Sequence, residues 1–374
     1  MGRGEFRVAC IVAALMALAT VLVASAYDLP MRDPDGVSVP TWVRLPLIVL
    51  AGVVVDVVRR WAVAARREGA AAPTVLAVLR ERWHLDQVRF TVIGLVAWYV
   101  AYVAFRNLKS YLPYVNDKLW DVELARIDRL LWLGHDPADV LHNLLGTGWA
   151  AWALSAVYFL WIGLVPAMLA IALVWTRRST TGELYVTAVS FNWLLGVAVY
   201  YLVPSLGPVY SAPQDFDELP RTFNTDVQQW LLDDRVAVLA DAWDTRAVQT
   251  IAAFASLHVA ITVTTCLVAE LIRVPRWIRV TGWVFAGLTA LSTVYLGWHF
   301  FVDVLGGIVV GTVALVLAAR TTGHSLRRRE QTWRPGVVPE ADGVPTSAPA
   351  PPATARRTTP PLRRRTSSVA RRSL

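Results

Sequence analysis

Long apolar stretches separated by short polar connections dominate the chain between residues 6 and 319. About 20 consecutive apolar residues are enough for a helix to cross the hydrocarbon core of a bilayer. By that measure the pattern predicts eight spanning helices, and the fold class is an all-α membrane protein. The predicted spans are residues 6–26, 40–58, 89–105, 149–175, 184–203, 250–272, 277–296 and 299–319.

The first apolar stretch also has some features of a secretory signal peptide. Ala24–Ser25–Ala26 would fit a cleavage site that requires small residues. However, the apolar run that begins at Val8 is longer than the core of a signal peptide, which is about 7–15 residues. We therefore expect the first helix to be retained as a membrane anchor.

Composition supports the assignment to a membrane. Of the 374 residues, 55% are hydrophobic and only 17% are charged, whereas a soluble domain has about 25% charged residues. A soluble fold would have to bury this excess in one core, and single cores stop growing at about 250–300 residues. The 17 Trp residues suit membrane interfaces. Cys10 and Cys266 both lie in apolar stretches, so we expect free thiols.

The charges in the connections predict an orientation, because Lys and Arg accumulate on the cytoplasmic side. Basic residues gather before the first span and in the second, fourth and sixth connections. They are Arg3, Arg7, Arg59, Arg60, Arg66, Arg67, Arg80, Arg82, Arg177, Arg178, Arg273, Arg276 and Arg279. By contrast, residues 205–249 hold eight acidic residues and three arginines. We expect this acidic loop outside and both termini in the cytoplasm.

Three regions follow from this organisation. Residues 1–88 would hold two spanning helices and a basic cytoplasmic loop, residues 89–320 six further spanning helices, and residues 321–374 a basic cytoplasmic tail. The tail is rich in Pro, Ala, Thr and Arg from residue 346 onward, which is typical of disorder. It carries much of the net charge of +8, so this charge predicts no nucleic-acid partner. Its arginines would instead lie near the lipids of the inner leaflet.

The connection 106–148 is long and amphipathic. Apolar residues recur in it at near-helical spacing, which predicts an interfacial helix on the outer face. They are Leu119, Val122, Ile127, Leu130 and Leu131, with Leu124 at the edge of the stripe. Gly307 and Gly311, in the last span, form a small-xxx-small pattern that is typical of close helix packing.

Three ionisable residues within the predicted spans indicate chemistry, because such groups are costly in a membrane. His258, His299 and Asp303 all map to the outer face. On a helix, His299 and Asp303 would share a face, and the carboxylate would fix the imidazole tautomer. His258 comes from another helix. Two histidines that flank one phosphorus atom suit in-line displacement, in which one attacks and the other protonates the leaving oxygen.

The residues around these groups form a recognisable pattern. The stretches 255–258 (Ala-Ser-Leu-His) and 292–299 (Ser-Thr-Val-Tyr-Leu-Gly-Trp-His), followed by Asp303, resemble the second and third signature motifs of the type 2 phosphatidic acid phosphatase superfamily. The nearest resemblance is to its branch of inositol phosphorylceramide synthases, which are inositolphosphotransferases. The resemblance covers residues 89–320 and implies that this region forms the six-helix catalytic core of that superfamily.

The resemblance also implies roles for individual residues. His299 would be the nucleophile that forms a phosphohistidine, Asp303 its orienting partner and His258 the general acid. Ser256 and Ser292 would bind the phosphoryl oxygens. The substrate would be a lipid phosphate or polyprenyl phosphate in the membrane, and no metal or cofactor would be required.

The pattern departs from the superfamily in its cationic residues. The first motif, a Lys followed by Arg-Pro, is absent from the corresponding stretch 201–208, and Thr293 stands where an arginine is usual. A transferring phosphoryl group still needs cationic stabilisation. Arg106 and Lys109, predicted at the outer end of the third span, are the replacements that we expect, with Arg221 and Arg246 as further candidates.

Other functions fit parts of the pattern. If an alcohol instead of water resolved the phosphohistidine, the protein would be a phosphotransferase, although we rank the phosphatase first. A bis-histidine haem protein would also place His258 and His299 on two helices, and a zinc site could use His258, His299 and Asp303 as ligands. A transporter would be expected to show inverted repeats, which we do not find in the sequence.

Overall fold

The computed structural model describes residues 5–34, 40–175 and 179–324 of the chain. Within these ranges every regular element is a helix, and no strand occurs. The predicted all-α fold class is therefore confirmed. The predicted disordered segment, 346–374, lies outside the described residues.

A long helix occupies each of the eight predicted spans. These helices are α1 (Arg7–Ala26), α2 (Thr41–Glu68), α4 (Leu85–Val115), α7 (Trp149–Ala170), α8 (Ser179–Leu202), α11 (Leu257–Leu271), α12 (Arg276–Tyr295) and α13 (Phe301–Thr321). Shorter helices lie in the connections. They are η1 (Gly69–Ala71), α3 (Val75–Arg82), α5 (Asp121–Leu131), α6 (Pro137–Leu145), η2 (Ile171–Trp175), α9 (Pro208–Ser211), η3 (Pro213–Phe216) and α10 (Phe223–Ala240).

Five stretches are long and apolar enough to cross a membrane by length and composition. They are Arg7–Ala26, Leu85–Val115, Trp149–Trp175, Thr180–Leu202 and Phe301–Thr321. Helix α11 is apolar but has only 15 residues, because it begins at Leu257 instead of at residue 250. Helix α4 extends to Val115. Arg106 and Lys109 therefore lie within a helix, more than a turn before its end.

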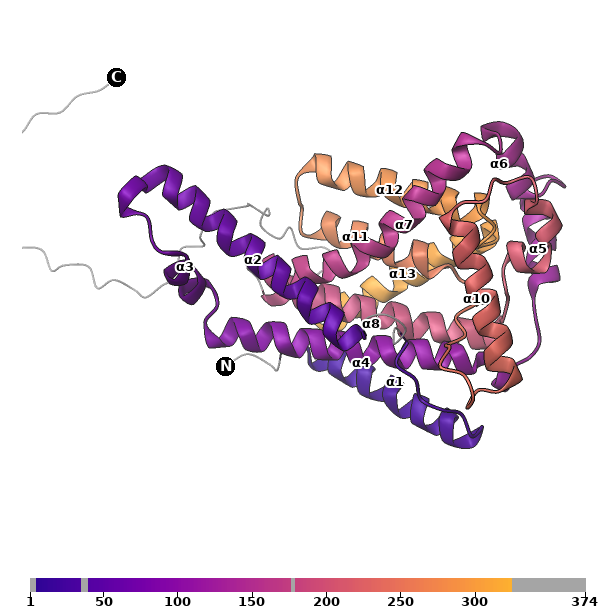
Figure 1. The fold of residues 1–374 in the computed structure, drawn as a ribbon, viewed down its shortest axis with the longest axis horizontal. Coiled ribbons are helices and arrows are strands. Elements are labelled where there is room, and N and C mark those ends of the chain that lie inside the picture. Colours follow the sequence, from indigo (N-terminus) through magenta and orange to yellow (C-terminus); the bar gives the residue numbers. More distant parts are fainter. Residues whose placement is uncertain (1–4, 35–39, 176–178, 325–374) are drawn as a thin grey trace, which may run out of the picture. The chain divides into compact units, whose positions relative to one another are not determined.

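The long helices pack in a continuous series of neighbours (Figure 1). Helix α1 contacts α4 and α8, α8 contacts α13, α13 contacts α11, α11 contacts α12, and α12 contacts α7. Helix α2 contacts α7, η2 and α3. Large aromatic side chains fill the contact between α4 and α8, where the Trp98 and Trp193 ring centroids are 4.8 Å apart.

Two glycines bring α11 and α13 into backbone contact. A Cβ atom on Gly307 would lie 2.4 Å from the Ser256 carbonyl oxygen, and one on Gly311 would lie 2.3 Å from the Ala260 carbonyl oxygen. The Thr264 hydroxyl donates across the same contact to the Gly311 carbonyl, at 3.0 Å. This is the close approach that the small-xxx-small pattern predicts, and it fixes the start of α11 against α13.

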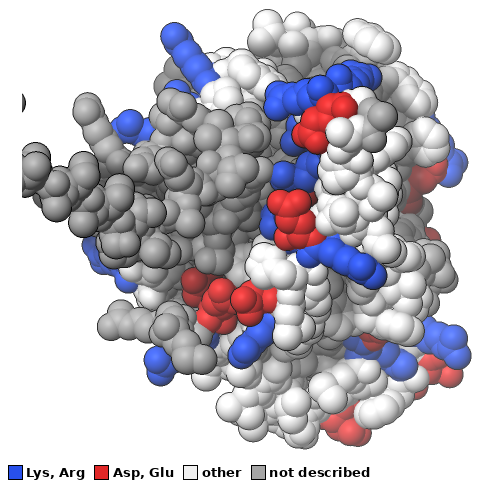
Figure 2. Space-filling view, turned by 90° about the vertical axis from the view of Figure 1, so that its left-hand side faces the viewer, with Lys and Arg blue, Asp and Glu red and all other residues white. Residues whose placement is uncertain are grey.

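The two ends of the helix bundle carry different connections (Figure 1). Helix α3 and the α11–α12 turn lie at one end, and Figure 2 shows Lys and Arg side chains spread over that face, with acidic side chains among them. Ion pairs there include Asp56 with Arg60 and Glu270 with Arg279. Helices α5, α6 and α10 lie at the other end, together with the first turns of α11 and α13.

Helix α5 occurs within the connection predicted to be amphipathic, and its apolar stripe points outward. Val122 is 66% exposed and Leu130 is 74% exposed. The buried face carries Asp121, Leu124 and Asp128. The helix thus turns two carboxylates and Leu124 toward the protein, and Val122 and Leu130 away from it.

Candidate active site

His258 is held by the first turn of α11. It is the second residue of that helix, and its neighbour Ser256 is the N-cap, with a hydroxyl that accepts from the Val259 amide at 3.4 Å. The half-buried imidazole packs against the rings of Tyr158 and Trp161 on α7, with centroids 5.0 Å and 4.3 Å away. The Trp161 indole N–H also donates to the His258 carbonyl, at 3.1 Å. Helices α7 and α11 together therefore fix this ring.

His299 lies in a loop, so the prediction that it begins the last helix is wrong. Helix α12 ends at Tyr295, and Gly297 turns the chain at a φ of +75°, a conformation that glycine adopts without steric cost. Helix α13 begins only at Phe301. The buried His299 is tied back to α12 by its own amide, which donates to the Thr293 carbonyl at 3.1 Å. We call residues 296–300 the His299 loop.

The three predicted site residues nevertheless meet in one hydrogen-bonded chain. His258 Nδ1 is 3.1 Å from His299 Nε2, and His299 Nδ1 is 3.3 Å from Asp303 Oδ2. The same Asp303 oxygen accepts from the Phe300 amide at 2.9 Å. A carboxylate at Nδ1 favours the tautomer with the proton there, which leaves the Nε2 lone pair facing His258.

Both imidazoles line a cavity of about 670 Å³, and Arg106 and Lys109 of α4 line it as well. The Lys109 Nζ atom lies 4.8 Å from the Tyr200 ring centroid. Among the described residues, Lys109 Nζ has neither an ion-pair partner nor a hydrogen-bond acceptor. Lys109 is half-buried. Because an ammonium group that is partly removed from water and has no anionic partner is costly, this cavity favours an anionic ligand.

The other predicted cations lie in different environments. Arg106 donates to the Tyr102 hydroxyl at 3.2 Å and to the Pro34 carbonyl at 3.4 Å. Arg246 also lines the cavity. Arg221 pairs with Asp226 at 2.7 Å, and its side chain is 83% exposed. Arg221 is therefore turned to solvent, away from the histidines.

The two predicted phosphate-binding serines are both fully buried and do not line the cavity. The Ser292 hydroxyl donates to the Leu154 carbonyl of α7, at 2.9 Å, so Ser292 joins two helices. Its expected contact with phosphate is not supported. Ser256 lies beside His258, but its hydroxyl caps its own helix. Its amide donates to the Asp303 carbonyl at 3.0 Å.

Side chains that we did not select from the sequence hold the His299 loop and the start of α13. On α10, Gln228 donates to the Leu296 carbonyl at 2.8 Å, and Asn224 accepts from the Trp298 indole at 2.6 Å. On α5, Asp128 accepts from the amides of Phe301 and Val302. The spacing of Asp121 and Asp128, which lie seven residues apart and so on the same side of α5, is a signal that could have revealed the α5 contact.

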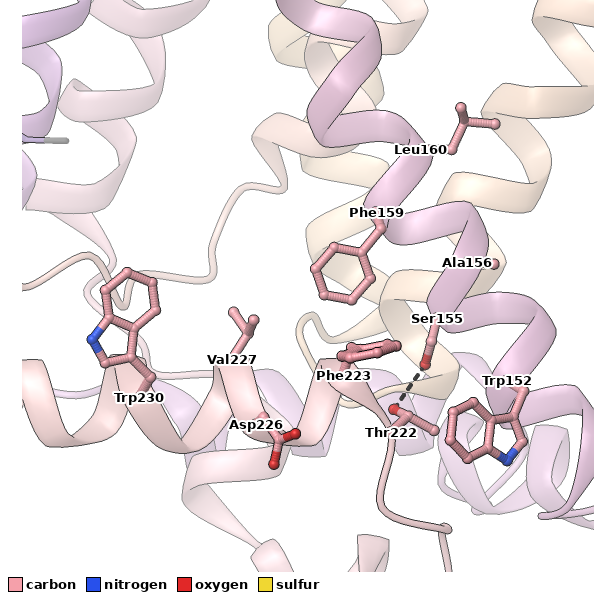
Figure 3. Close-up of a pocket in the computed structure, with 10 residues that line it drawn as sticks. All are labelled: Trp152, Ser155, Ala156, Phe159, Leu160, Thr222, Phe223, Asp226, Val227 and Trp230. Carbon is pink, nitrogen blue, oxygen red and sulfur yellow. Dashed lines mark hydrogen bonds between the residues drawn. The ribbon is translucent and has the colours of Figure 1, made fainter. Parts of the chain in front are cut away.

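An open, mostly apolar groove lies between α7 and α10 (Figure 3). Its volume is about 900 Å³. Phe159 of α7 and Phe223 of α10 lie close together in it, and the Ser155 and Thr222 hydroxyls are 3.0 Å apart. Val227 and Trp230 line both this groove and the histidine cavity. The two spaces therefore adjoin at α10.

The geometry is unfavourable for the haem and zinc alternatives. The facing ring nitrogens, 3.1 Å apart, leave no room for a porphyrin between them. His299 uses opposite ring nitrogens toward His258 and Asp303, so the three side chains do not converge on one point. In the described part of the chain, no group of three or more His, Cys, Asp or Glu residues could hold a metal ion.

Comparison with known sequences defines the class of the protein. Residues 122–317, more than half of the chain, match the PAP2 superfamily. The chain therefore belongs to the PAP2 superfamily, whose enzymes are generally phosphatases or phosphotransferases. The match does not distinguish the inositol phosphorylceramide synthase branch. It begins at residue 122, so α4, with Arg106 and Lys109, lies outside it.

No curated protein and no solved structure showed significant similarity to the chain.

Proposed function

We propose that the protein is a membrane-embedded phosphatase that acts on a lipid-linked phosphate through a phosphohistidine on His299. The observation that carries the proposal is the chain of Asp303, His299 and His258 at one cavity. Membership of the PAP2 superfamily supports this type of reaction.

The reaction would proceed in two displacements. The Nε2 lone pair of His299 attacks phosphorus, so that a P–N bond forms while the P–O bond to the lipid breaks, and His258 gives a proton to the leaving oxygen. Water then attacks phosphorus, so that a new P–O bond forms while the P–N bond to His299 breaks. His258 takes a proton from that water, and inorganic phosphate leaves. Asp303 stabilises the positive charge that develops on His299. The hydrogen bond between the imidazoles must break for phosphorus to reach Nε2.

Lys109 is the residue best placed to replace the missing cations of the first motif. Its ammonium group lines the same cavity as both imidazoles and has no anionic partner among the described residues. A phosphoryl group would supply that partner. In the transition state its negative charge spreads over the equatorial oxygens, and the ammonium group would stabilise that charge. Arg106 lies one turn earlier on α4 and would add a second charge to the same wall.

The groove between α7 and α10 supports a substrate that carries a hydrocarbon chain. It is mostly apolar, and it adjoins the cavity through Val227 and Trp230. A phosphate in the cavity could therefore remain attached to a chain that lies in the groove. The acyl chain of a phospholipid and a polyprenyl chain both have this chemistry.

The proposal places the active site on the extracytoplasmic side. His258 is in the first turn of α11, and His299 lies just before α13. Both helices begin at the end of the bundle that carries α5 and α10 (Figure 1), where the connection 205–249 is rich in acidic residues. The connections at the opposite end hold most of the loop arginines, and basic loops face the cytoplasm.

The test compares the wild type with His299→Ala after purification in detergent. Phosphate release is measured from dioctanoyl phosphatidic acid, a polyprenyl phosphate and a polyprenyl diphosphate. We expect release by the wild type from at least one of these substrates and a loss of about 10³-fold or more in the variant. His135→Ala, at an exposed position in the α5–α6 connection, is the matched control. Equal activity in wild type and His299→Ala would disprove the nucleophile.

Addition of inositol or another polyol distinguishes hydrolysis from transfer. If water resolves the phosphohistidine, phosphate release is unaffected by the polyol. A phosphorylated polyol among the products would instead identify a phosphotransferase that uses the same three residues.

A further inference from the structure

The position of His299 in a loop leaves it without the support of a regular helix. Its own amide bonds to α12, but the chain on its C-terminal side must be fixed by contacts outside the loop. The first amides of a helix have no partners within that helix. In α13 these amides belong to the residues that directly follow His299.

Asp128, from α5, supplies the missing partners. Its Oδ2 atom accepts from the Phe301 amide at 2.6 Å, and its Oδ1 atom accepts from the Val302 amide at 2.8 Å. The Trp132 ring, just after α5, packs on the Phe301 ring at a centroid distance of 5.3 Å. One side chain from a separate helix therefore caps α13 with both of its oxygens.

A carboxylate suits this position for a physical reason. The start of a helix carries a partial positive charge that favours anions, and hydrogen bonds to an ionised acceptor are stronger than neutral ones. Asp128 is only 2% exposed, so water competes little for these bonds. Asp128 does not line the histidine cavity, and for this reason it is not a candidate for contact with the substrate.

Asp121 supports the same loop indirectly from two turns earlier on α5. Its carboxylate accepts from the amides of Leu206 and Gly207, at 2.8–3.0 Å. Gly207 has a φ of +102°, and a Cβ atom there would lie 2.6 Å from the Trp298 carbonyl oxygen. The turn that Asp121 holds therefore presses directly on the residue before His299.

From these contacts we infer that Asp128 is a positioning residue for the reaction proposed above. By capping α13 from outside the bundle, it holds His299 at the distance from His258 and Asp303 that phosphoryl transfer requires. The inference rests on the proposed function. Displacement of a reacting group by about 1 Å can cost about 10²-fold in rate, so the effect of losing Asp128 should be large.

The experiment compares Asp128→Asn, which preserves shape, and Asp128→Ala with the wild type. Glu123→Gln, on the same helix, is the control. Among the described residues, the Glu123 carboxylate accepts no hydrogen bond from the 206–207 turn or from the start of α13. Steady-state rates are measured with dioctanoyl phosphatidic acid in detergent micelles and are normalised to folded protein. The second readout is the rise in melting temperature that orthovanadate, a phosphate analogue, produces in each protein.

We expect Asp128→Asn to lower kcat about tenfold and Asp128→Ala about a hundredfold, with KM changed less than about threefold. The orthovanadate shift should fall in the same order, and Glu123→Gln should match the wild type. If kcat per folded molecule is unchanged in both Asp128 variants, Asp128 is only a structural cap and the inference is wrong. A wild type that neither releases phosphate nor responds to orthovanadate would instead remove the proposed function, and the inference with it.

Discussion

The two histidines meet at 3.1 Å, yet they are held in different ways. His258 lies on a helix whose backbone is packed directly against α13 at Gly307 and Gly311. His299 lies on a loop that separate side chains from α5 and α10 tie in place. A substitution can remove a single side-chain hydrogen bond, whereas a substitution in the backbone contact disturbs the packing of both helices. We therefore expect changes at the helix contact to lower stability and changes at the loop ties to lower turnover.

The largest effect should come from His258 itself. We expect His258→Ala to reduce phosphate release from a lipid phosphate by about 10²–10⁴-fold, because the leaving oxygen is no longer protonated. p-Nitrophenyl phosphate has a leaving group that needs no proton, so its hydrolysis should fall much less. A parallel loss on both substrates would mean that His258 is not the general acid.

The close contact of α11 and α13 can be tested with Gly311→Ala. The added Cβ would meet the Ala260 carbonyl, and overpacking of this kind costs about 1–3 kcal/mol. We expect a lower melting temperature with near-normal turnover per folded molecule. The control is Gly287→Ala on α12, where nothing lies within 4 Å of the added atom. If Gly311→Ala melts like the wild type, the helices are not in backbone contact.

The loop ties can be tested with two adjacent glutamines. Gln228 donates to the Leu296 carbonyl, at 2.8 Å and in a buried position, whereas the exposed Gln229 bonds to Asp233. We expect Gln228→Ala to lower kcat about tenfold with little change in melting temperature, because one hydrogen bond contributes about 0.5–1.5 kcal/mol. Gln229→Ala should behave as the wild type. Equal kinetics for the two variants would show that α10 does not position the loop.

The smallest effect concerns pH. Burial is the main reason that the pKa of Asp128 is raised to about 6. The charges of Asp303 and Asp136 also raise this pKa, whereas the hydrogen bonds from the Phe301 and Val302 amides lower it. The folded protein thus holds this proton more tightly than the unfolded chain does. Asp128 therefore stabilises the fold below about pH 4, and this contribution is lost as the pH rises through about 6.

The measurement is the difference in melting temperature between the wild type and Asp128→Asn from pH 4.5 to 7.5. The wild type should lose its relative advantage as the pH rises. A difference that stays constant or grows would contradict the raised pKa.

The sequence was sufficient to predict the long helices and the proximity of His258, His299 and Asp303. Their apolar length defines the spans, and ionisable groups within such spans are rare enough to be conspicuous. The position of His299 could not be predicted in the same way. A helical pattern that runs through residues 299–319 conceals the turn at Gly297. This glycine has a positive φ, and Phe216 and Val209 leave no room for a Cβ atom there.

The residues that support the site were harder to find. Asp128 and Gln228 belong to helices far from His299 in the sequence, and each acts by bonding to backbone amides or carbonyls. A hydrogen bond to a backbone group does not restrict the residue type at that position, so the sequence does not reveal such a contact. Ser292 illustrates the converse, because its place in a motif suggested phosphate binding, whereas its hydroxyl joins α12 to α7.

The outward face of α5 would connect the proposed chemistry to the surrounding lipid. Val122 and Leu130 are exposed, whereas Asp128 is buried, and an exposed apolar face of this kind would insert among headgroups and acyl chains. Lateral pressure in the bilayer would then press the helix onto the start of α13. We expect turnover to depend on the medium, with slow rates in short-chain detergent and faster rates after reconstitution into nanodiscs.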